Sequence, residues 1–403
     1  MSPPRAVDIG GQTHPAYAAI AEAFAENFAR RGELGAACCI YRDGTKVVDL
    51  WGGVRDAATG APWQADTMVL VYSLTKGMAA MVLALAHARG WLDYDARVAD
   101  YWPGFAQNGK AAITVRQLLA HQAGLHAFHR RVDRATIADR ARLVAVLESE
   151  RPRWPPGRRH AYHFLSLGFY AGELLRRVDP AGRSLGQVFR DEIAQPLGIE
   201  FHIGLPATVP DDRLAVLVQP GLVGSIAALP RGMRLALLNP WSETFRACMV
   251  NPGARVVHDP ARIYARDLEV PSGGGVGTAR AVAAAYGAFA AGGSALGLGP
   301  ATLAELCAPA RPPAEGLFDH VLRTEAAYAL GFMKPFPGYD FGSPAAFGAP
   351  GAGGAFGYAD PATRIGYGYV TNRIGTGIDA DPRDLALRAA LARVAAQVPG
   401  EPS

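Results

Sequence analysis

The sequence predicts an α+β fold of the α/β sandwich type, in which both chain ends form one antiparallel sheet flanked by helices. Strand patterns occur near the N-terminus, at residues 34–53, and again near the C-terminus, at residues 353–371. Between them, from Leu92 to Thr278, helical patterns dominate. This order favours one sheet with an inserted, mostly helical region. A cleft between the two regions is the expected place for a functional site.

We expect residues 1–403 to form a single domain with subregions. Residues 1–91 and 268–403 are assigned to the α/β part, and residues 92–267 to the mostly helical part. Within the helical part, residues 221–267 are rich in large apolar residues but lack sustained periodicity. Long irregular segments are often functional, so we expect this one to cover the cleft, with a simple packed insertion as the alternative.

A helix and a hairpin open the fold. Residues 14–32 (HPAYAAIAEAFAENFARRG) place apolar residues at helical spacing and stop at Gly32. Residues 34–53 (LGAACCIYRDGTKVVDLWGG) predict two strands around Asp43-Gly44, a dipeptide typical of hairpin turns.

The later elements are marked by capping residues and turns. Three helix starts are expected, at Thr114-x-x-Gln117, at Ser184-x-x-Gln187 and at Asp381 before Pro382. The last of them opens an amphipathic C-terminal helix. Before it, two strands are expected at Gly353–Tyr358 and Ile365–Thr371, joined by a turn around Asp360-Pro361.

Composition limits the partners and the compartment. The formal charge is only +4 and the arginines are scattered, so we expect neither nucleic acid nor a membrane surface as a partner. The N-terminus lacks the basic and apolar regions of a signal peptide, so a cytoplasmic location is the expectation. The cysteines are interpreted as reduced core residues: Cys38, Cys39, Cys248 and Cys307. Composition does not determine the oligomeric state.

Ser73-Leu74-Thr75-Lys76 is the candidate for nucleophilic chemistry. Only four lysines and 11 serines occur in the chain, so about 0.1 such S-x-x-K pairs are expected by chance. Lysine, unlike arginine, can lose its proton in a desolvated site and act as a base. At the start of the apolar helix that follows, Ser73 and Lys76 share a face, and the helix N-terminus favours a developing oxyanion. The alternative is that Ser73 or Thr75 only caps the helix and Lys76 is solvated.

Other motifs carry less weight. The sequence GFAQNGKA at 104–111 imitates a phosphate-binding loop, but Ala111 stands where that loop needs a hydroxyl for magnesium. The histidine pairs lack an acidic or cysteine partner at metal-ligand spacing, so we interpret them as solvated side chains or supports around the site. These pairs are His126-x-x-His129 and His160-x-x-His163. No G-x-S-x-G elbow occurs, which argues against an α/β-hydrolase. We expect no metal and no cofactor.

Four segments in order carry a resemblance to a known family. They are YSLTKG, ITVRQLLAHQAGL (113–125), PPGRRHAYHFLSLGFYAGELLRRV (155–178) and FGAPGAGGAFGYADPATRIGYGYVTN (347–372). In this order they resemble the serine β-lactamase and penicillin-binding-protein superfamily, and more closely the family VIII carboxylesterases with a class C β-lactamase fold. The resemblance runs over nearly the whole chain and implies a β-lactamase/transpeptidase-like sheet and helical region.

The resemblance also implies roles for single residues. Ser73 is then the nucleophile, Lys76 its base partner, and Tyr162 the tyrosine of the second motif, which can relay a proton to the leaving alcohol. Without the family, Tyr162 would be one of 14 tyrosines. The oxyanion hole is expected from the backbone N–H groups of Ser73 and Ala352. His121, in a family-typical stretch, is interpreted as structural and close to the cleft.

Two positions depart from the family's pattern. Phe164 stands where β-lactamases have an asparagine, which weakens the case for efficient β-lactam turnover. Ala349-Pro350-Gly351 stands where they have Lys-Thr-Gly and many esterases have His-x-Gly, so a neutral ester is favoured. Gly351 and Gly353 are expected to let substrate approach the strand edge, with Phe164 beside it. Trp241 and Phe245 are candidate pocket walls, with ordinary core burial as the alternative.

The resulting hypothesis is a serine carboxylesterase that hydrolyses small hydrophobic acyl esters through an acyl-enzyme on Ser73. It leaves open a weak hydrolysis of β-lactams. The partner is a small-molecule ester. The alternatives are an acyltransferase of the same fold, which passes the acyl group to an alcohol or amine, and a catalytically silent homologue that binds a ligand.

Overall fold

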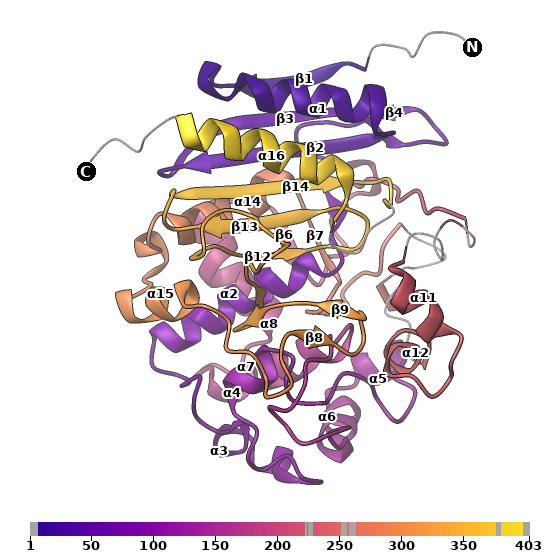
Figure 1. Ribbon diagram of the computed structural model, residues 1–403, viewed down its shortest axis with the longest axis vertical. Helices are drawn as coiled ribbons and strands as arrows, with labels where there is room; N and C mark the ends of the chain where they lie inside the picture. The colour runs from indigo at the N-terminus through magenta and orange to yellow at the C-terminus, as the bar shows by residue number, and fades with distance from the viewer. Residues whose placement is uncertain are drawn as a thin grey trace.

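One antiparallel sheet of nine strands joins the two ends of the chain (Figure 1). We describe a computed structural model that covers residues 7–221, 224, 229–250, 256–257, 263–375 and 380–397. The strands are β1 (Ile9–Thr13), β2 (Gly35–Arg42), β3 (Thr45–Asp56), β4 (Ala61–Pro62), β10 (Tyr328–Ala329), β11 (Phe332–Met333), β12 (Phe347–Pro350), β13 (Phe356–Asp360) and β14 (Ile365–Thr371). Their order is β1-β3-β2-β14-β13-β12-β11-β10, with β4 beside β3. Because β2 pairs with β14, the prediction of a sheet built from both chain ends is confirmed.

Local backbone geometry explains one strand prediction that holds and one that does not. Asp43 (φ 50°) and Gly44 (φ 75°) both adopt the left-handed conformation that a two-residue hairpin needs, so β2 and β3 meet at the predicted turn. The strand predicted at Gly353–Tyr358 is wrong at its start, because β13 begins only at Phe356. Gly353 and Gly354 have φ values of 96° and 113°, which interrupt the extended chain.

Helices cover both faces of this sheet. On one face lie α1 (Ala18–Arg30) and α16 (Pro382–Gln397), and on the other lie α2 (Leu74–Ala88) and α14 (Ala279–Ala290). Strand β14 shows why α14 can approach. Its tyrosines Tyr367 and Tyr369 join the core beneath α1 and α16, whereas a Cβ on Gly366 would lie 2.2 Å from a backbone nitrogen of α14. Small residues on one side of a strand therefore admit the helix.

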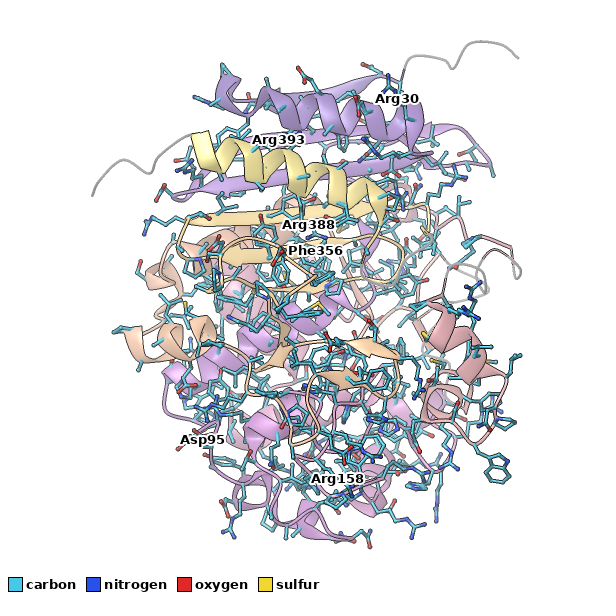
Figure 2. All side chains as sticks on the ribbon, in the orientation of Figure 1. Arg30, Asp95, Arg158, Phe356, Arg388 and Arg393 are labelled. Carbon is cyan, nitrogen blue, oxygen red and sulfur yellow. The ribbon has the colours of Figure 1, made fainter. Side chains whose placement is uncertain are left out.

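The C-terminal helix α16 is anchored at its start and along its buried side. The Asp381 side chain accepts a hydrogen bond from Arg383 N at 2.9 Å, which confirms the predicted helix start. Figure 2 labels Arg388 beside Phe356, and its guanidinium carbon lies 4.7 Å from the centre of that ring. The same guanidinium bonds Asp384 at 2.7 Å, so the buried charge is paired.

Helices are the main regular elements between α2 and α14, as predicted, although irregular chain makes up more of the described part of this region than the helices do. Its helices are α3 (Val98–Tyr101), α4 (Val115–Leu119), α5 (Arg134–Ala138), α6 (Arg140–Ser149), α7 (Ser166–Val178), α8 (Leu185–Phe189), α9 (Gln195–Leu197), α11 (Arg231–Leu237) and α12 (Glu243–Phe245), and α15 (Pro300–Cys307) follows α14. The capping boxes predicted at Thr114 and Ser184 both form, with reciprocal bonds to Gln117 and Gln187.

Part of the segment 221–267 lies outside the described residues, namely 222–223, 225–228, 251–255 and 258–262. The described part is more regular than expected, because it forms α11, α12 and a π-helical turn at Arg246–Val250. These elements lie together at one edge of the molecule (Figure 1).

A small three-stranded sheet fixes the entrance to α2. It consists of β5 (Val69–Leu70), β7 (Gly275–Gly277) and β6 (Phe201–Ile203), in the order β5-β7-β6. A separate hairpin pairs β8 (Phe318–Asp319) with β9 (Thr324–Glu325). Because β5 runs directly into the segment that holds Ser73, pairing with β7 brings residues near 272 to the start of α2.

Two further findings concern membranes and cysteines. Over the described part of the chain, the helices are either too short or too polar to cross a bilayer.

The four cysteines are free thiols, as expected. Cys38 and Cys39 enter the two different cores on opposite faces of the sheet, as neighbours in a strand must.

Candidate active site

Ser73 lies at the N-terminus of α2 with its hydroxyl unused by the helix. The residue has helical dihedrals (φ −66°, ψ −14°) and, within the described chain, makes no side-chain capping bond. Thr75 ties the neighbouring segments instead. Its hydroxyl donates to Tyr72 O at 2.5 Å and accepts from Gly275 N at 2.8 Å. The alternative that Ser73 is only a helix cap is therefore not supported.

Lys76 is buried beside Ser73, not solvated. Only 4% of the residue is exposed, and Nζ lies 3.2 Å from Ser73 Oγ. The same nitrogen donates to Phe164 O at 2.9 Å and to Ser272 O at 2.8 Å. Burial lowers the pKa of Lys76 from 10.5 to about 7. A neutral amine has two hydrogens, which the two carbonyls accept, so its lone pair faces the Ser73 hydroxyl.

Close packing between two backbone segments holds the carbonyls of Phe164 and Ser272 in place. The Ser272 hydroxyl accepts from Gly168 N at 2.6 Å and donates to Leu165 O at 2.8 Å, so Ser272 is bound to the start of α7. A Cβ on Gly168 would lie 2.4 Å from Ser272 N. A glycine is thus required where α7 meets the chain that carries the second carbonyl.

Tyr162 lies beside Lys76. Nζ of Lys76 is 4.7 Å from the centre of the Tyr162 ring, and Tyr162 is 9% exposed. Phe164 packs edge-on against this ring at 5.0 Å, and His121 packs at 4.8 Å. The structure thus brings the predicted Ser73, Lys76 and Tyr162 to one place. The asparagine side chain is lost at Phe164, but its backbone carbonyl still holds Lys76.

The glycine-rich segment after β12 has a different role from the one predicted. Gly351 is buried, and a Cβ there would lie 2.2 Å from Val71 O. Gly353 is also buried and would collide with Ile374 at 2.6 Å. Neither lines the cavity. Gly351 allows close packing against the entrance of α2, and Gly353 allows close packing against the chain that follows β14. Ala352 between them is exposed and does line the cavity.

A cavity of about 650 Å³ opens beside Ser73. Its lining is predominantly apolar: Ser73, Lys76, His121, Tyr162, Phe164, Leu229, Met233, Arg234, Leu237, Leu238, Cys248, Met249, Leu322, Tyr328, Gly331, Phe332, Met333, Ala349, Pro350 and Ala352. A volume of this size suits a small organic ligand. Several of these residues come from α11 and the turn after α12, which places the described part of the segment 221–267 at the cavity.

Two predicted wall residues are corrected by this geometry. Trp241 is 79% exposed, and neither it nor Phe245 belongs to the cavity lining. The wall is made instead by Met233 and Leu237 of α11, together with Met249. Cys248 lies at the cavity and not in a core, and burial raises the pKa of its thiol to about 12, so the thiol stays protonated.

Most of these histidines are buried supports: His121, His126, His160 and His163 are buried, whereas His129 is exposed. His121 Nδ1 accepts from His163 N at 3.0 Å, and His163 Nδ1 donates to Ala161 O at 2.6 Å. Burial lowers the pKa of His163 to about 3 and that of His160 to about 4, so both are neutral at ordinary pH. His126 Nε2 bonds Glu243 at 2.8 Å. Among the described residues, no cluster of three or more metal-ligating side chains occurs.

Sequence reasoning missed Asp319 and Tyr328. Asp319 is fully buried, and its carboxylate accepts hydrogen bonds from the Val321 and Leu322 amides at 2.8 Å, from the Tyr162 amide, and from Tyr328 Oη at 3.1 Å. Burial raises the pKa of this carboxyl group. Tyr328 packs on His121 at 4.5 Å and lines the cavity. Nothing in the local sequence separates this aspartate from one in an ordinary turn.

Comparisons with known proteins show the family and the fold of the chain. A family model described as Beta-lactamase matches residues 20–392. The chain is 36% identical over 374 residues to Esterase/beta-lactamase LipL of Mycobacterium tuberculosis. The aligned part covers 90% of this chain and 83% of that protein. A crystal structure of a family VIII carboxylesterase is similar with a TM-score of 0.80 and 36% identity, covering 96% of this chain and 100% of the other. A penicillin-binding protein homologue from Caulobacter crescentus gives a TM-score of 0.83 and 36% identity, with the same coverage of 96% and 100%.

Proposed function

The chain belongs to the Beta-lactamase family, and from this premise we propose that it is a serine carboxylesterase that acts through an acyl-enzyme on Ser73. The similarity to proteins named as esterases supports a serine hydrolase of this fold. The observation that carries the proposal is the position of Lys76 Nζ, buried and 3.2 Å from Ser73 Oγ.

Lys76 is the general base in this mechanism. The carbonyls of Phe164 and Ser272 occupy the two hydrogens of the neutral amine, so only its lone pair is available to the Ser73 proton. As the proton moves to Nζ, Ser73 Oγ attacks the ester carbonyl carbon. The two carbonyls then stabilise the ammonium that forms, because each accepts a charge-assisted hydrogen bond.

The oxyanion is held by backbone donors. Ser73 N–H lies at the N-terminus of α2, where the helix dipole favours negative charge. Ala352 N–H is the second donor, at the exposed point between two buried glycines. Losing one such donor typically costs about 3 kcal/mol of transition-state stabilisation. The oxyanion hole depends on backbone N–H groups. It does not require the lysine or histidine side chain that the family has at the position of Ala349.

Tyr162 and water complete the cycle. The tyrosine hydroxyl gives its proton to the leaving alcohol and regains one from Lys76, so the C–O bond of the ester breaks without releasing an alkoxide. Water then attacks the acyl carbon, its proton passes to the same pair, and Ser73 is regenerated with release of the acid. Ester and water are consumed, and acid and alcohol are formed.

The substrates are esters with a hydrophobic acyl group. The cavity of about 650 Å³ exceeds what an acetyl group requires, so small to medium-length acyl chains fit its apolar wall. The phenyl ring of Phe164 offers no hydrogen bond to a β-lactam amide. We therefore expect β-lactam hydrolysis to be weak compared with ester hydrolysis.

The direct test is labelling of the intact protein with a serine-reactive phosphonate, read by mass spectrometry. The wild type should gain the mass of one adduct, and Ser73→Ala should gain none. Ser149→Ala is the matched control, because Ser149 is exposed at the end of α6 and should label normally. Labelling that persists without Ser73 contradicts the mechanism.

The same experiment separates the alternatives. A wild type that takes no label from the phosphonate or from activated esters favours the silent homologue. An acyl adduct that an added alcohol releases faster than water favours the acyltransferase. A panel of p-nitrophenyl esters of increasing acyl length, compared with a chromogenic cephalosporin, then defines the substrate class.

A further inference from the structure

One charged side chain at the cavity is not used by the proposed mechanism. Among the described residues that line the cavity, the lysine is Lys76 and the arginine is Arg234. Lys76 is buried and engaged by Ser73 and two carbonyls. Arg234 is exposed, and its guanidinium has no hydrogen bond or ion pair to any described residue. This contrasts with the many arginines of the chain that pair with carboxylates, such as Arg388 with Asp384.

The fold holds Arg234 at the cavity through a helix. On α11, Met233, Arg234, Leu237 and the following Leu238 all line the cavity, at a spacing that places them on one helical face. Met233 is 3% exposed and anchors this face. Arg231 is exposed on the same helix but does not line the cavity.

A lone guanidinium at the mouth of an apolar cavity suits an anion. Arginine remains charged at any working pH and binds carboxylates through a planar pair of donors. The strand edge offers no competing cation, because the side chain at Ala349 is a methyl group that is 4% exposed. An ester that brings its own carboxylate would be paired by Arg234 while its apolar part fills the cavity.

We propose that Arg234 binds a carboxylate on the substrate, and that the substrate class is amphiphilic esters that carry one carboxylate at the outer end. This inference rests on the proposed esterase function and names its substrate class. The carboxylate can lie on the acyl chain or on the leaving alcohol. Both sources present the same chemistry to Arg234, and the substrates of the test distinguish them.

The test compares matched pairs of esters at low salt. One pair is the p-nitrophenyl monoester of a dicarboxylic acid and the neutral p-nitrophenyl ester of the same chain length. The other is the butyrate ester of 3-hydroxybenzoate and phenyl butyrate. For each pair the measured quantity is the ratio of kcat/KM, carboxylate ester over neutral ester.

Arg234→Gln should lower this ratio about two- to fivefold for the favoured pair, as expected when one exposed ion pair is lost. Arg234→Lys should restore part of the ratio, and added salt should lower it in the wild type. Arg231→Gln is the matched control and should keep the wild-type ratio. A ratio that Arg234→Gln leaves unchanged in both pairs overturns the inference.

A binding measurement separates this inference from the esterase function. Ser73→Ala cannot form the acyl-enzyme, so calorimetric titration with the carboxylate and neutral esters reports recognition alone. Tighter binding of the carboxylate ester, lost in Ser73→Ala/Arg234→Gln, supports the inference even if no ester is turned over. Equal binding of both esters refutes it, whereas Ser73-dependent labelling would leave the esterase function intact.

Discussion

The pH dependence of acylation follows directly from the burial of Lys76. The desolvated amine has a pKa of about 7, and only its neutral form can accept the Ser73 proton. The acylation rate should therefore fall about tenfold for each pH unit below 7 and level off above about pH 8. His163 and His160, with pKa values lowered to about 3 and 4, stay neutral in this window and do not contribute.

The same pKa change has a calculable effect on stability. Below pH 7 the amine is protonated in both the folded and the unfolded chain. The shift of its pKa from 10.5 to about 7 then destabilises the folded state by about 5 kcal/mol. Between the two pKa values the unfolded chain binds the proton and the folded chain does not, so the free energy of unfolding rises with pH. From pH 7 to pH 9 the linkage relation gives a gain of about 2 kcal/mol for the wild type relative to Lys76→Met.

Two assays check these values. Stopped-flow acylation by an activated ester between pH 5.5 and 9 gives the apparent pKa, and urea unfolding at pH 7, 8 and 9 gives the stability difference. Lys76→Arg keeps the positive charge but cannot lose its proton, so it should acylate about 10²- to 10⁴-fold more slowly. A flat rate profile, or an apparent pKa near 10, would refute the assignment of Lys76 as the base.

Two further predictions concern Tyr162. Tyr162→Phe keeps the ring contacts with Phe164 and His121 but removes the hydroxyl, so the steady-state rate should drop about 10²- to 10⁴-fold, and near-wild-type turnover would remove Tyr162 from the mechanism. Asp319→Asn places an NH₂ donor against groups that also donate, among them the Tyr162 amide and the Tyr328 hydroxyl. It should lower the free energy of unfolding by about 1–3 kcal/mol and reduce kcat more than it changes KM. Unchanged urea unfolding together with unchanged kcat would contradict the role of Asp319 in positioning Tyr162.

The lysines show what a sequence argument can and cannot detect. Three of the four are buried and donate to backbone carbonyls: Lys76, Lys110 and Lys334. Burial lowers the pKa of both Lys110 and Lys334 to about 8. The rarity of lysine therefore marks desolvated sites in general, and the serine one turn away distinguishes Lys76. The likeness of 104–111 to a phosphate-binding loop has no such support, because Lys110 is bound to the carbonyls of Glu148 and Glu150.

The sequence alone determined the elements whose causes are local. The hairpin at Asp43-Gly44, the capping boxes at Thr114 and Ser184, and the Ser73–Lys76 spacing all depend on residues a few positions apart. Their backbone angles and hydrogen bonds are set by neighbours in the chain, so the pattern is sufficient to predict them.

Only the tertiary structure decided the surroundings of Ser73. It placed Met233 at the cavity and left Trp241 in solvent, and it gave Lys76 its two carbonyl partners from Phe164 and Ser272. It also showed that Gly351 serves packing against Val71 O, not substrate approach. These outcomes depend on contacts between residues 88 to 280 positions apart in the chain. The spacing of apolar residues within one segment does not show which distant segment will bury a given side chain.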